Sequence, residues 1–198
     1  MTFKEYWGKQ FGNPTGFGGK IATFIMNKMN KAMYKVVLNK IYQKTSILDI
    51  GFGNGYLLKK HIKKNNSNFF GIDISQDMVS IATKRNKNAI RQGKLQLIKA
   101  SVDEIPFEKT FGYIYTINTV YFWQDLKNGL QEIYNKLEVG GEFLNLCYTK
   151  KWLDKLGYTK NYKKYTEEEL LRATQEIGFV AEIIVIKQNK SFYIKAIK

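Results

Sequence analysis

The sequence predicts an α/β fold with a mostly parallel sheet and helices on both of its faces. Two observations lead to this prediction. Short apolar runs typical of strands alternate with longer segments whose apolar residues recur at helical spacing. Such alternation predicts parallel strands that are joined and covered by helices. At the end of the chain, two β-rich runs flank residues 188–190, which predicts a hairpin and therefore an antiparallel last strand.

The elements can be placed in order along the chain. The expected strands lie near residues 46–51, 69–73, 95–99, 112–118, 142–148, 179–187 and 191–197. The expected helices lie near residues 20–44, 55–64, 76–90, 125–138 and 166–177. Thr166 and Glu169 form a capping box at the start of the last helix, and Gly178 is a good C-cap after its end.

The turn after the first expected strand is the most informative segment. Asp49 lies in the apolar run 47–50, and Gly51, Gly53 and Gly55 follow at every second position before a helical pattern begins. Glycine permits positive φ angles and lets a ligand approach the backbone closely. The start of the following helix adds free N–H groups. The segment therefore predicts a binding site for the polar end of a ligand.

Two common ligand classes are disfavoured by the residues around such turns. The dinucleotide fingerprint needs glycine or alanine three residues after its second glycine, and Tyr56 occupies that position. A Walker loop is excluded because Pro14 and Ile21 replace its first glycine and its last Ser or Thr around Gly19-Lys20.

Four segments together resemble the class I S-adenosylmethionine (SAM)-dependent methyltransferases. Asp49-x-Gly51-x-Gly53-x-Gly55 is similar to the first motif of the family, and the run 73–82, which begins Asp73-x-Ser75, is similar to the second. Residues 100–103 are similar to its adenine-binding corner. Residues 137–141 are similar to the turn before its fifth strand, with Val139 in place of the usual proline.

The resemblance covers residues 40–198 best, and the first 40 residues are loosely similar to the lid and leading helix of the ubiquinone/menaquinone-type small-molecule branch. It implies one Rossmann-like domain over residues 1–198, with a seven-stranded sheet. Residues 1–44 would form an N-terminal lid and helix, and residues 45–198 the core.

The resemblance also implies roles for individual residues. Asp49 and the glycine turn would contact the methionyl end of SAM, and Asp73 would accept hydrogen bonds from both ribose hydroxyls. Asp103 would accept from the adenine amino group, with Ile74 and Met78 flanking the ring. The cofactor-binding residues expected in this way are Asp49, Gly51, Phe52, Gly53, Gly55, Asp73, Ile74, Met78, Ser101, Val102, Asp103 and Asn118.

The acceptor side is less defined. Asn118 and Tyr121 have the spacing of the Asn-Pro-Pro-Tyr motif of amino-group methyltransferases, but both prolines are missing. They are weak catalytic candidates, and no general base is evident. Aromatic residues suggest a flat, apolar or cationic acceptor. The expected pocket residues are Tyr6, Trp7, Phe11, Tyr121, Trp123, Tyr148, Tyr162 and Tyr165.

The composition limits the possible partners, metal sites and location of the protein. The formal net charge is +15, yet only three of the 32 basic residues are arginines, so a nucleic-acid partner is possible but not favoured. Cys147 is the single cysteine, which excludes an internal disulfide, and no metal-ligand spacing is visible. No apolar run is long enough to span a membrane, and a cytoplasmic location is expected. The oligomeric state is left open.

These observations predict an enzyme that transfers the methyl group of SAM to a small-molecule acceptor and releases S-adenosylhomocysteine. Two alternatives stay open, namely an RNA or protein methyltransferase and a non-catalytic module that binds SAM. The acceptor is not identified, nor is it settled whether oxygen, nitrogen, carbon or sulfur receives the methyl group.

Overall fold

The computed structural model describes residues 26–40 and 43–198 of the chain. The expected aromatic pocket residues Tyr6, Trp7 and Phe11, and most of the expected N-terminal lid, lie outside these residues.

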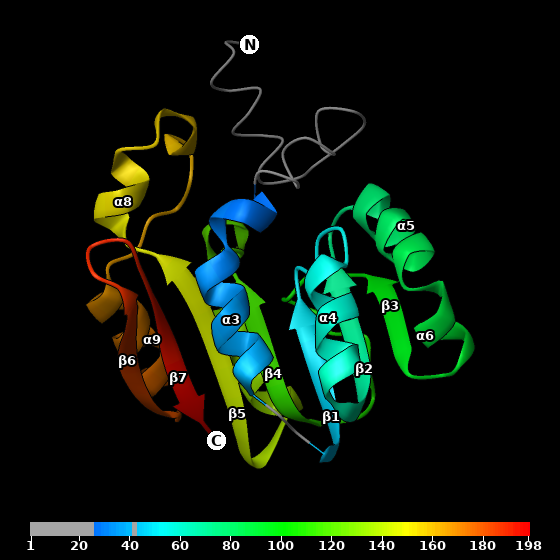
Figure 1. The fold of residues 1–198 in the computed structure, drawn as a ribbon. Helices are drawn as coiled ribbons and strands as arrows, with labels where there is room; N and C mark the ends of the chain where they lie inside the picture. Colours follow the sequence, from blue (N-terminus) through cyan, green and yellow to red (C-terminus); the bar gives the residue numbers. More distant parts are fainter. Residues whose placement is uncertain (1–25, 41–42) are drawn as a thin grey trace.

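A seven-stranded sheet forms the centre of the molecule (Figure 1). Its strands are β1 (Gln43–Ile50), β2 (Asn66–Asp73), β3 (Leu95–Lys99), β4 (Phe111–Ile117), β5 (Leu137–Tyr148), β6 (Val180–Lys187) and β7 (Ser191–Ile197). The strand order is β3-β2-β1-β4-β5-β7-β6. The five adjacent strands β3, β2, β1, β4 and β5 pair in parallel, whereas β7 runs antiparallel to both of its neighbours, β5 and β6. The mostly parallel sheet with an antiparallel last strand is therefore confirmed.

Helices cover both faces of this sheet. The longer ones are α3 (Lys31–Asn39), α4 (Tyr56–Lys64), α5 (Gln76–Arg85), α7 (Leu126–Lys136) and α9 (Glu167–Glu176). Helices α3 and α4 lie side by side on one face of the sheet in Figure 1, where α4 packs on β2. Helices α7 and α9 pack together on the opposite face, where Tyr134 of α7 and Phe143 of β5 both contact Phe179.

Shorter elements complete the chain, and several of them adjoin the carboxyl ends of the strands. They are α6 (Lys87–Arg91), α8 (Lys150–Asp154) and the 3-10 helices η1 (Val120–Phe122) and η2 (Gly157–Thr159). The segment η1 follows β4, whereas α8 and η2 follow β5. Except for α6, which overlaps the helix expected over residues 76–90, these elements were not expected from the sequence, because each is too short to display a hydrophobic period.

Three expected boundaries were wrong. The helix expected over residues 20–44 ends at Asn39, and β1 already begins at Gln43. The helix expected over residues 76–90 is divided at Asn86, whose side-chain amide donates to the backbone oxygens of Ala82 and Gly55. Asparagine can interrupt a helix in this way because its side chain competes for backbone partners. The strand expected to begin at 142 begins at Leu137, which pairs with Phe111 of β4, and Gly140 has a φ of 76° within it.

The fold places a binding region where the strand order reverses. Strands β1 and β4 are neighbours in the sheet, but β2 and β3 continue on one side and β5 on the other. The loops after β1 and β4 leave the sheet in different directions at this point, so a crevice opens beyond the carboxyl ends of the strands.

Candidate functional site

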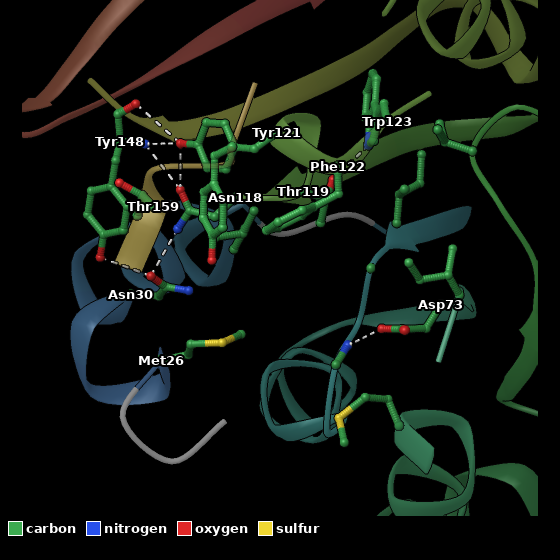
Figure 2. Close-up of a pocket in the computed structure, with 18 of the residues that line it drawn as sticks. Met26, Asn30, Asp73, Asn118, Thr119, Tyr121, Phe122, Trp123, Tyr148 and Thr159 are labelled. Carbon is green, nitrogen blue, oxygen red and sulfur yellow. Dashed lines mark hydrogen bonds between the residues drawn. The ribbon is translucent and has the colours of Figure 1, made fainter. Parts of the chain in front are cut away.

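A continuous pocket occupies that crevice. One half is formed by the glycine turn after β1, the end of β2 and the segment after β3, and we call it the glycine-turn half. The other is formed by the segment after β4, the end of β5, α8, η2 and the residues just before α3, and we call it the aromatic half. In Figure 2, Asp73 lies toward one end of the pocket, and Asn30, Asn118, Tyr121 and Tyr148 cluster at the other.

The glycine turn forms the wall between the strand ends. Gly51 has a φ of 75°, and a Cβ built on it would overlap the side-chain methyl group of Thr119. Gly51 and Gly53 both line the pocket. Gly55 is different, because the structure does not bring it to the pocket: a Cβ there would lie 2.8 Å from the Cβ of Ala82. Gly55 permits α4 to pack closely on α5, and its expected contact with a ligand is not supported by its position.

Asp73 lies at the carboxyl end of β2 with its carboxylate held in place. One oxygen accepts from the backbone N–H of Gly53 at 2.8 Å, and the other accepts from that of Ser75 at 2.9 Å. Burial raises the pKa of this carboxyl group, while the two N–H groups act to lower it. Each oxygen keeps a free lone pair, so the carboxylate can accept hydrogen bonds from two neighbouring hydroxyl groups.

Next to Asp73 the pocket is lined mainly by apolar residues, and we call this part the apolar slot. Ile74 is 48% exposed although it is a large apolar side chain, whereas Met78 is buried. Ala100, Ser101 and Val102 complete the lining of the slot. A flat apolar ring system inserted here would cover Ile74 and recover the hydrophobic free energy that its exposure costs.

Asp103 does not line this pocket. Its Oδ2 accepts from the Ser101 hydroxyl at 2.8 Å. Its Oδ1 is buried and, among the described residues, has no hydrogen-bond partner. An unpaired buried acceptor of this kind is suited to a donor such as an amino group. The carboxylate is thus placed behind the slot rather than within it.

Asp49 lies beneath the glycine turn beside a second, smaller cavity that also touches Asn30, Tyr34, Phe52 and Leu57. Tyr115 donates a hydrogen bond to its Oδ2 at 2.9 Å. Burial raises the pKa of Asp49 to about 8, and the nearby Asp73 carboxylate acts in the same direction. Gly51 and Gly53 line both cavities, so Asp49 and Phe52 lie just behind the wall of the main pocket.

A hydrogen-bonded network of four side chains fixes the aromatic half. The Asn118 amide donates to Asn30 Oδ1 at 3.0 Å, and the Tyr148 hydroxyl donates to the same oxygen at 3.0 Å. Asn118 Oδ1 accepts from the Tyr148 backbone N–H and from the Tyr121 hydroxyl, both at 3.1 Å. Asn118 itself has a φ of 57°, which asparagine tolerates better than most residues. Asn118 Oδ1 shares both donors with other acceptors, because the Tyr148 N–H also donates to the Tyr121 hydroxyl at 2.6 Å and that hydroxyl lies 3.2 Å from the Tyr148 backbone oxygen.

The rest of the aromatic half is apolar or weakly polar. Tyr121 stacks on Tyr162, with ring centroids 6.0 Å apart. The residues that complete this half are Met26, Met29, Phe122, Leu153, Leu156, Tyr158 and Thr159. Burial raises the pKa of Tyr121, Tyr148, Tyr158 and Tyr162 above the usual tyrosine value. These hydroxyls are consequently poor bases near neutral pH.

Of the five expected aromatic residues that the structure describes, four lie in the pocket lining. Tyr121, Trp123, Tyr148 and Tyr162 line it, whereas Tyr165 does not. Trp123 also packs against α7, since a Cβ on Gly129 would lie 2.9 Å from its ring, and its indole N–H donates to Thr119.

Sequence reasoning missed the contribution of the segment before α3. Met26, Met29 and Asn30 line the pocket, although the apolar pattern there was interpreted only as core packing. The signal was Asn30, a polar residue between Met29 and Met33 in an otherwise apolar helical pattern. A buried amide at such a position needs polar partners, which here are Asn118 and Tyr148.

His61 takes no part in the pocket. It lies on α4 and is fully buried, with its ring packed against Phe69, Tyr113 and Tyr115. Burial lowers its pKa to about 4, so the imidazole is neutral at physiological pH. Its role is in the packing of α4 on the sheet.

Comparisons with known proteins agree with this geometry. A family model described as a methyltransferase domain matches residues 47–141. The chain is 29% identical over 126 residues to the uncharacterized methyltransferase YdaC of Bacillus subtilis (strain 168), covering 62% of this chain and 67% of that protein. It is 26% identical over 139 residues to the ubiquinone/menaquinone biosynthesis C-methyltransferase UbiE of Rickettsia prowazekii, covering 67% and 55%.

A solved structure extends the match over the whole fold. Geranyl diphosphate C-methyltransferase from Streptomyces coelicolor A3(2), solved with Mg²⁺, geranyl diphosphate and S-adenosyl-L-homocysteine, superposes with a TM-score of 0.74 at 14% identity, covering 98% of this chain and 96% of that one. The chain belongs to the class I SAM-dependent methyltransferases, with SAM as methyl donor and S-adenosylhomocysteine as product. Among the residues that the structure describes, no helix is long and apolar enough to cross a bilayer.

Proposed function

We propose that this methyltransferase acts on an uncharged small molecule with a flat or apolar body. The observation that carries the proposal is the chemistry of the pocket lining. Among the described residues, Asp73 is the single charged side chain that lines the pocket, and it lies in the glycine-turn half. An ionised acceptor in the aromatic half would lose its hydration without gaining a charged partner, which costs several kcal/mol.

The cofactor would occupy the glycine-turn half. The two free lone pairs of Asp73 suit the ribose hydroxyls, and the apolar slot lined by Ile74 and Val102 suits the adenine ring. Asp49, behind the glycine turn, suits the ammonium group of the methionyl end. SAM supplies a methyl group that is already activated by a sulfonium, so the protein's task is to hold the acceptor in line with it.

The protein residues that surround the acceptor hold it in place and exclude water. They do not remove a proton from it. In the described part of the pocket, the aromatic half contains no histidine or carboxylate, and its tyrosines are poor bases. The acceptor atom must therefore be nucleophilic without a strong protein base. The side chain of Asn118 already contacts Asn30, Tyr121 and the Tyr148 backbone, so the expected role of Asn118 in holding an amine would require these contacts to rearrange.

Matched pairs of acceptors test the substrate class. Release of S-adenosylhomocysteine would be measured with phenol, hydroquinone, aniline and thiophenol, each beside its carboxylated analogue. We expect the neutral member of a pair to react at least about tenfold faster, which corresponds to about 1.4 kcal/mol. Preference for the carboxylated members, or methylation of RNA in place of small molecules, would contradict the proposal.

A binding experiment tests the placement of the cofactor separately. Asp73→Asn replaces an acceptor oxygen by an amide that faces a backbone N–H, so we expect calorimetry to show at least about tenfold weaker binding of S-adenosylhomocysteine. Asp77→Asn is the matched control, because Asp77 lies exposed in the first turn of α5 and does not line the pocket. Equal affinity of the two variants would argue against the role given to Asp73.

A further inference from the structure

A second depression lies outside the pocket, along helices α3 and α4, and it encloses about 1380 Å³. We call it the basic groove. Among the described residues that line it there are eight cationic side chains and no carboxylate. The cationic residues are Lys28, Lys31, Lys35, Lys60, Lys64, Arg85, Lys187 and Lys190.

The lysines on the two helices form two rows. Lys28, Lys31 and Lys35 follow one another at intervals of three and four residues, so they project from one side of α3 and the turn before it. Lys60 and Lys64 are four residues apart on α4, which lies beside α3 (Figure 1). In the described part of the chain, the three salt bridges use other lysines. Like charges at this spacing repel each other, so the rows lower stability unless a partner neutralises them.

The lining of the groove also contains apolar residues. Met29, Ala32, Leu38 and Ile81 line the groove together with the half-buried rings of Tyr34 and Tyr56. A partner that fits both features must carry both negative charges and an apolar face. A phosphate backbone supplies the charges but leaves the apolar lining uncovered.

Other features of the groove also disfavour single-stranded nucleic acid. Proteins bind such strands by stacking bases on exposed aromatic faces and by arginine contacts. Here the ammonium group of Lys60 lies 4.5 Å from the centre of the Tyr56 ring and covers it. The one arginine among the described lining residues, Arg85, donates to the backbone oxygen of Asn54 at 2.9 Å. A flat lipid surface, in turn, does not enter a groove between two helices.

We propose that the basic groove docks an acidic amphipathic helix of a partner protein. Carboxylates spaced three and four residues apart on that helix would face the two lysine rows, and its apolar face would cover the apolar lining. The docked helix would also adjoin the methyl-transfer site. Met29 and Tyr148 line both the groove and the pocket, and Arg85 contacts the glycine turn through Asn54.

The experiment uses the full chain and a synthetic peptide of about 20 residues with glutamates and leucines on opposite faces of a helix. Binding is measured by fluorescence anisotropy beside a scrambled peptide of the same composition, a poly(U) 20-mer and anionic phosphatidylglycerol vesicles. One variant carries Lys31→Glu, Lys35→Glu and Lys60→Glu in the groove. The control variant carries Lys94→Glu, Lys109→Glu and Lys127→Glu, three exposed lysines outside it, so both variants have the same net charge.

We expect the amphipathic peptide to bind the wild-type protein at least tenfold more tightly than the scrambled peptide. The groove variant should lose at least tenfold in affinity for this peptide, whereas the control variant should keep most of it. Both variants should bind S-adenosylhomocysteine like the wild type, which shows that they are folded. Equal binding of the two peptides, equal losses in the two variants, tighter binding of poly(U) or vesicles, or no binding at all would overturn the proposal.

Discussion

The Cα of Gly51 lies against the side-chain methyl group of Thr119, so the turn after β1 and the segment after β4 meet without space for a Cβ between them. Gly51 has a φ of 75°, and Thr119 in turn accepts a hydrogen bond from the Trp123 indole N–H at 3.1 Å. This contact joins the two loops of the switch point. It also fixes the position of the glycine turn relative to the aromatic half of the pocket.

Gly51→Ala tests this contact. The new methyl group would both overlap Thr119 and sit on a left-handed backbone, so we expect unfolding free energy to fall by ~2–4 kcal/mol. Thr119→Ser removes the methyl group that is overlapped and keeps the hydroxyl that accepts from Trp123. The double variant should therefore recover about 1 kcal/mol relative to Gly51→Ala in urea titrations. Strictly additive effects would show that Thr119 is not the obstacle.

We predict that Asp49 couples cofactor binding to the release of a proton. Its pKa of about 8 means that the carboxyl group is mostly protonated at pH 7 in the ligand-free protein. An ammonium group beside it would favour the ionised form, so we expect about one proton to be released per S-adenosylhomocysteine bound at pH 7. Calorimetry in phosphate and Tris buffers measures this number.

Asp49→Asn provides the control for that measurement. The amide cannot release a proton, so the dependence of the binding enthalpy on buffer should disappear. Affinity of the wild type should also rise between pH 6 and pH 8, and this rise should be missing in the variant. If the variant releases as many protons as the wild type, then another group is responsible.

His61 makes stability depend on pH in mildly acidic solution. Its pKa is about 4 in the folded protein and about 6.5 when unfolded, so the unfolded chain binds the proton first. The free energy of unfolding should fall as pH drops from 6.5 to 4, by an amount on the order of 3 kcal/mol from this group. Asp49 acts in the opposite sense, because its raised pKa makes the folded state the better proton acceptor between pH 8 and 4.

The variant His61→Leu separates the contribution of the histidine from that of Asp49. The measured quantity is the slope of the free energy of unfolding against pH, compared between the variant and the wild type. Urea titrations at several pH values should give a flatter, or reversed, dependence between pH 6.5 and 4 in the variant. Parallel curves for the two proteins would mean that the folded state binds the His61 proton as readily as the unfolded chain does, and the prediction would be wrong.

The parts of this fold that could be predicted are those that a local pattern encodes. Every strand was expected near its observed place, because buried parallel strands are continuous apolar runs between turn residues. The divided helix at Asn86 was not expected, since the cause is a hydrogen bond to Gly55 31 residues away. The early start of β5 at Leu137 likewise depends on pairing with Phe111, which no local pattern reveals.

The candidate site shows the same division. The glycine turn and Asp73 follow strands directly, so their position at the sheet edge could be predicted from sequence. The aromatic half is assembled from the segment before α3, the loop after β4 and the α8–η2 region. Its central hydrogen bond joins Asn30 to Tyr148 across 118 residues of sequence. Such a contact exists only after the sheet has formed, and it explains why Asn30 was missed.

Asn30 is the acceptor on which that network depends, and this leads to a last prediction. Its Oδ1 accepts from both Asn118 and Tyr148 in a buried site. Asn30→Ala would leave two donors unpaired, so we expect unfolding free energy to fall by ~2–4 kcal/mol, whereas Tyr148→Phe removes one donor and should cost ~1 kcal/mol.

The effects on catalysis should follow the same order as the effects on stability, with Asn30→Ala larger than Tyr148→Phe. Loss of Asn30 frees Asn118 and Tyr148 to move in the aromatic half, so KM for the acceptor should rise. The affinity for S-adenosylhomocysteine, which we propose to bind in the other half, should change little. Tyr148→Phe keeps the ring and should alter KM less. Urea titrations and steady-state kinetics measure the two effects. Equal costs for the two variants, or weaker cofactor binding with unchanged KM, would show that the network does not serve the acceptor.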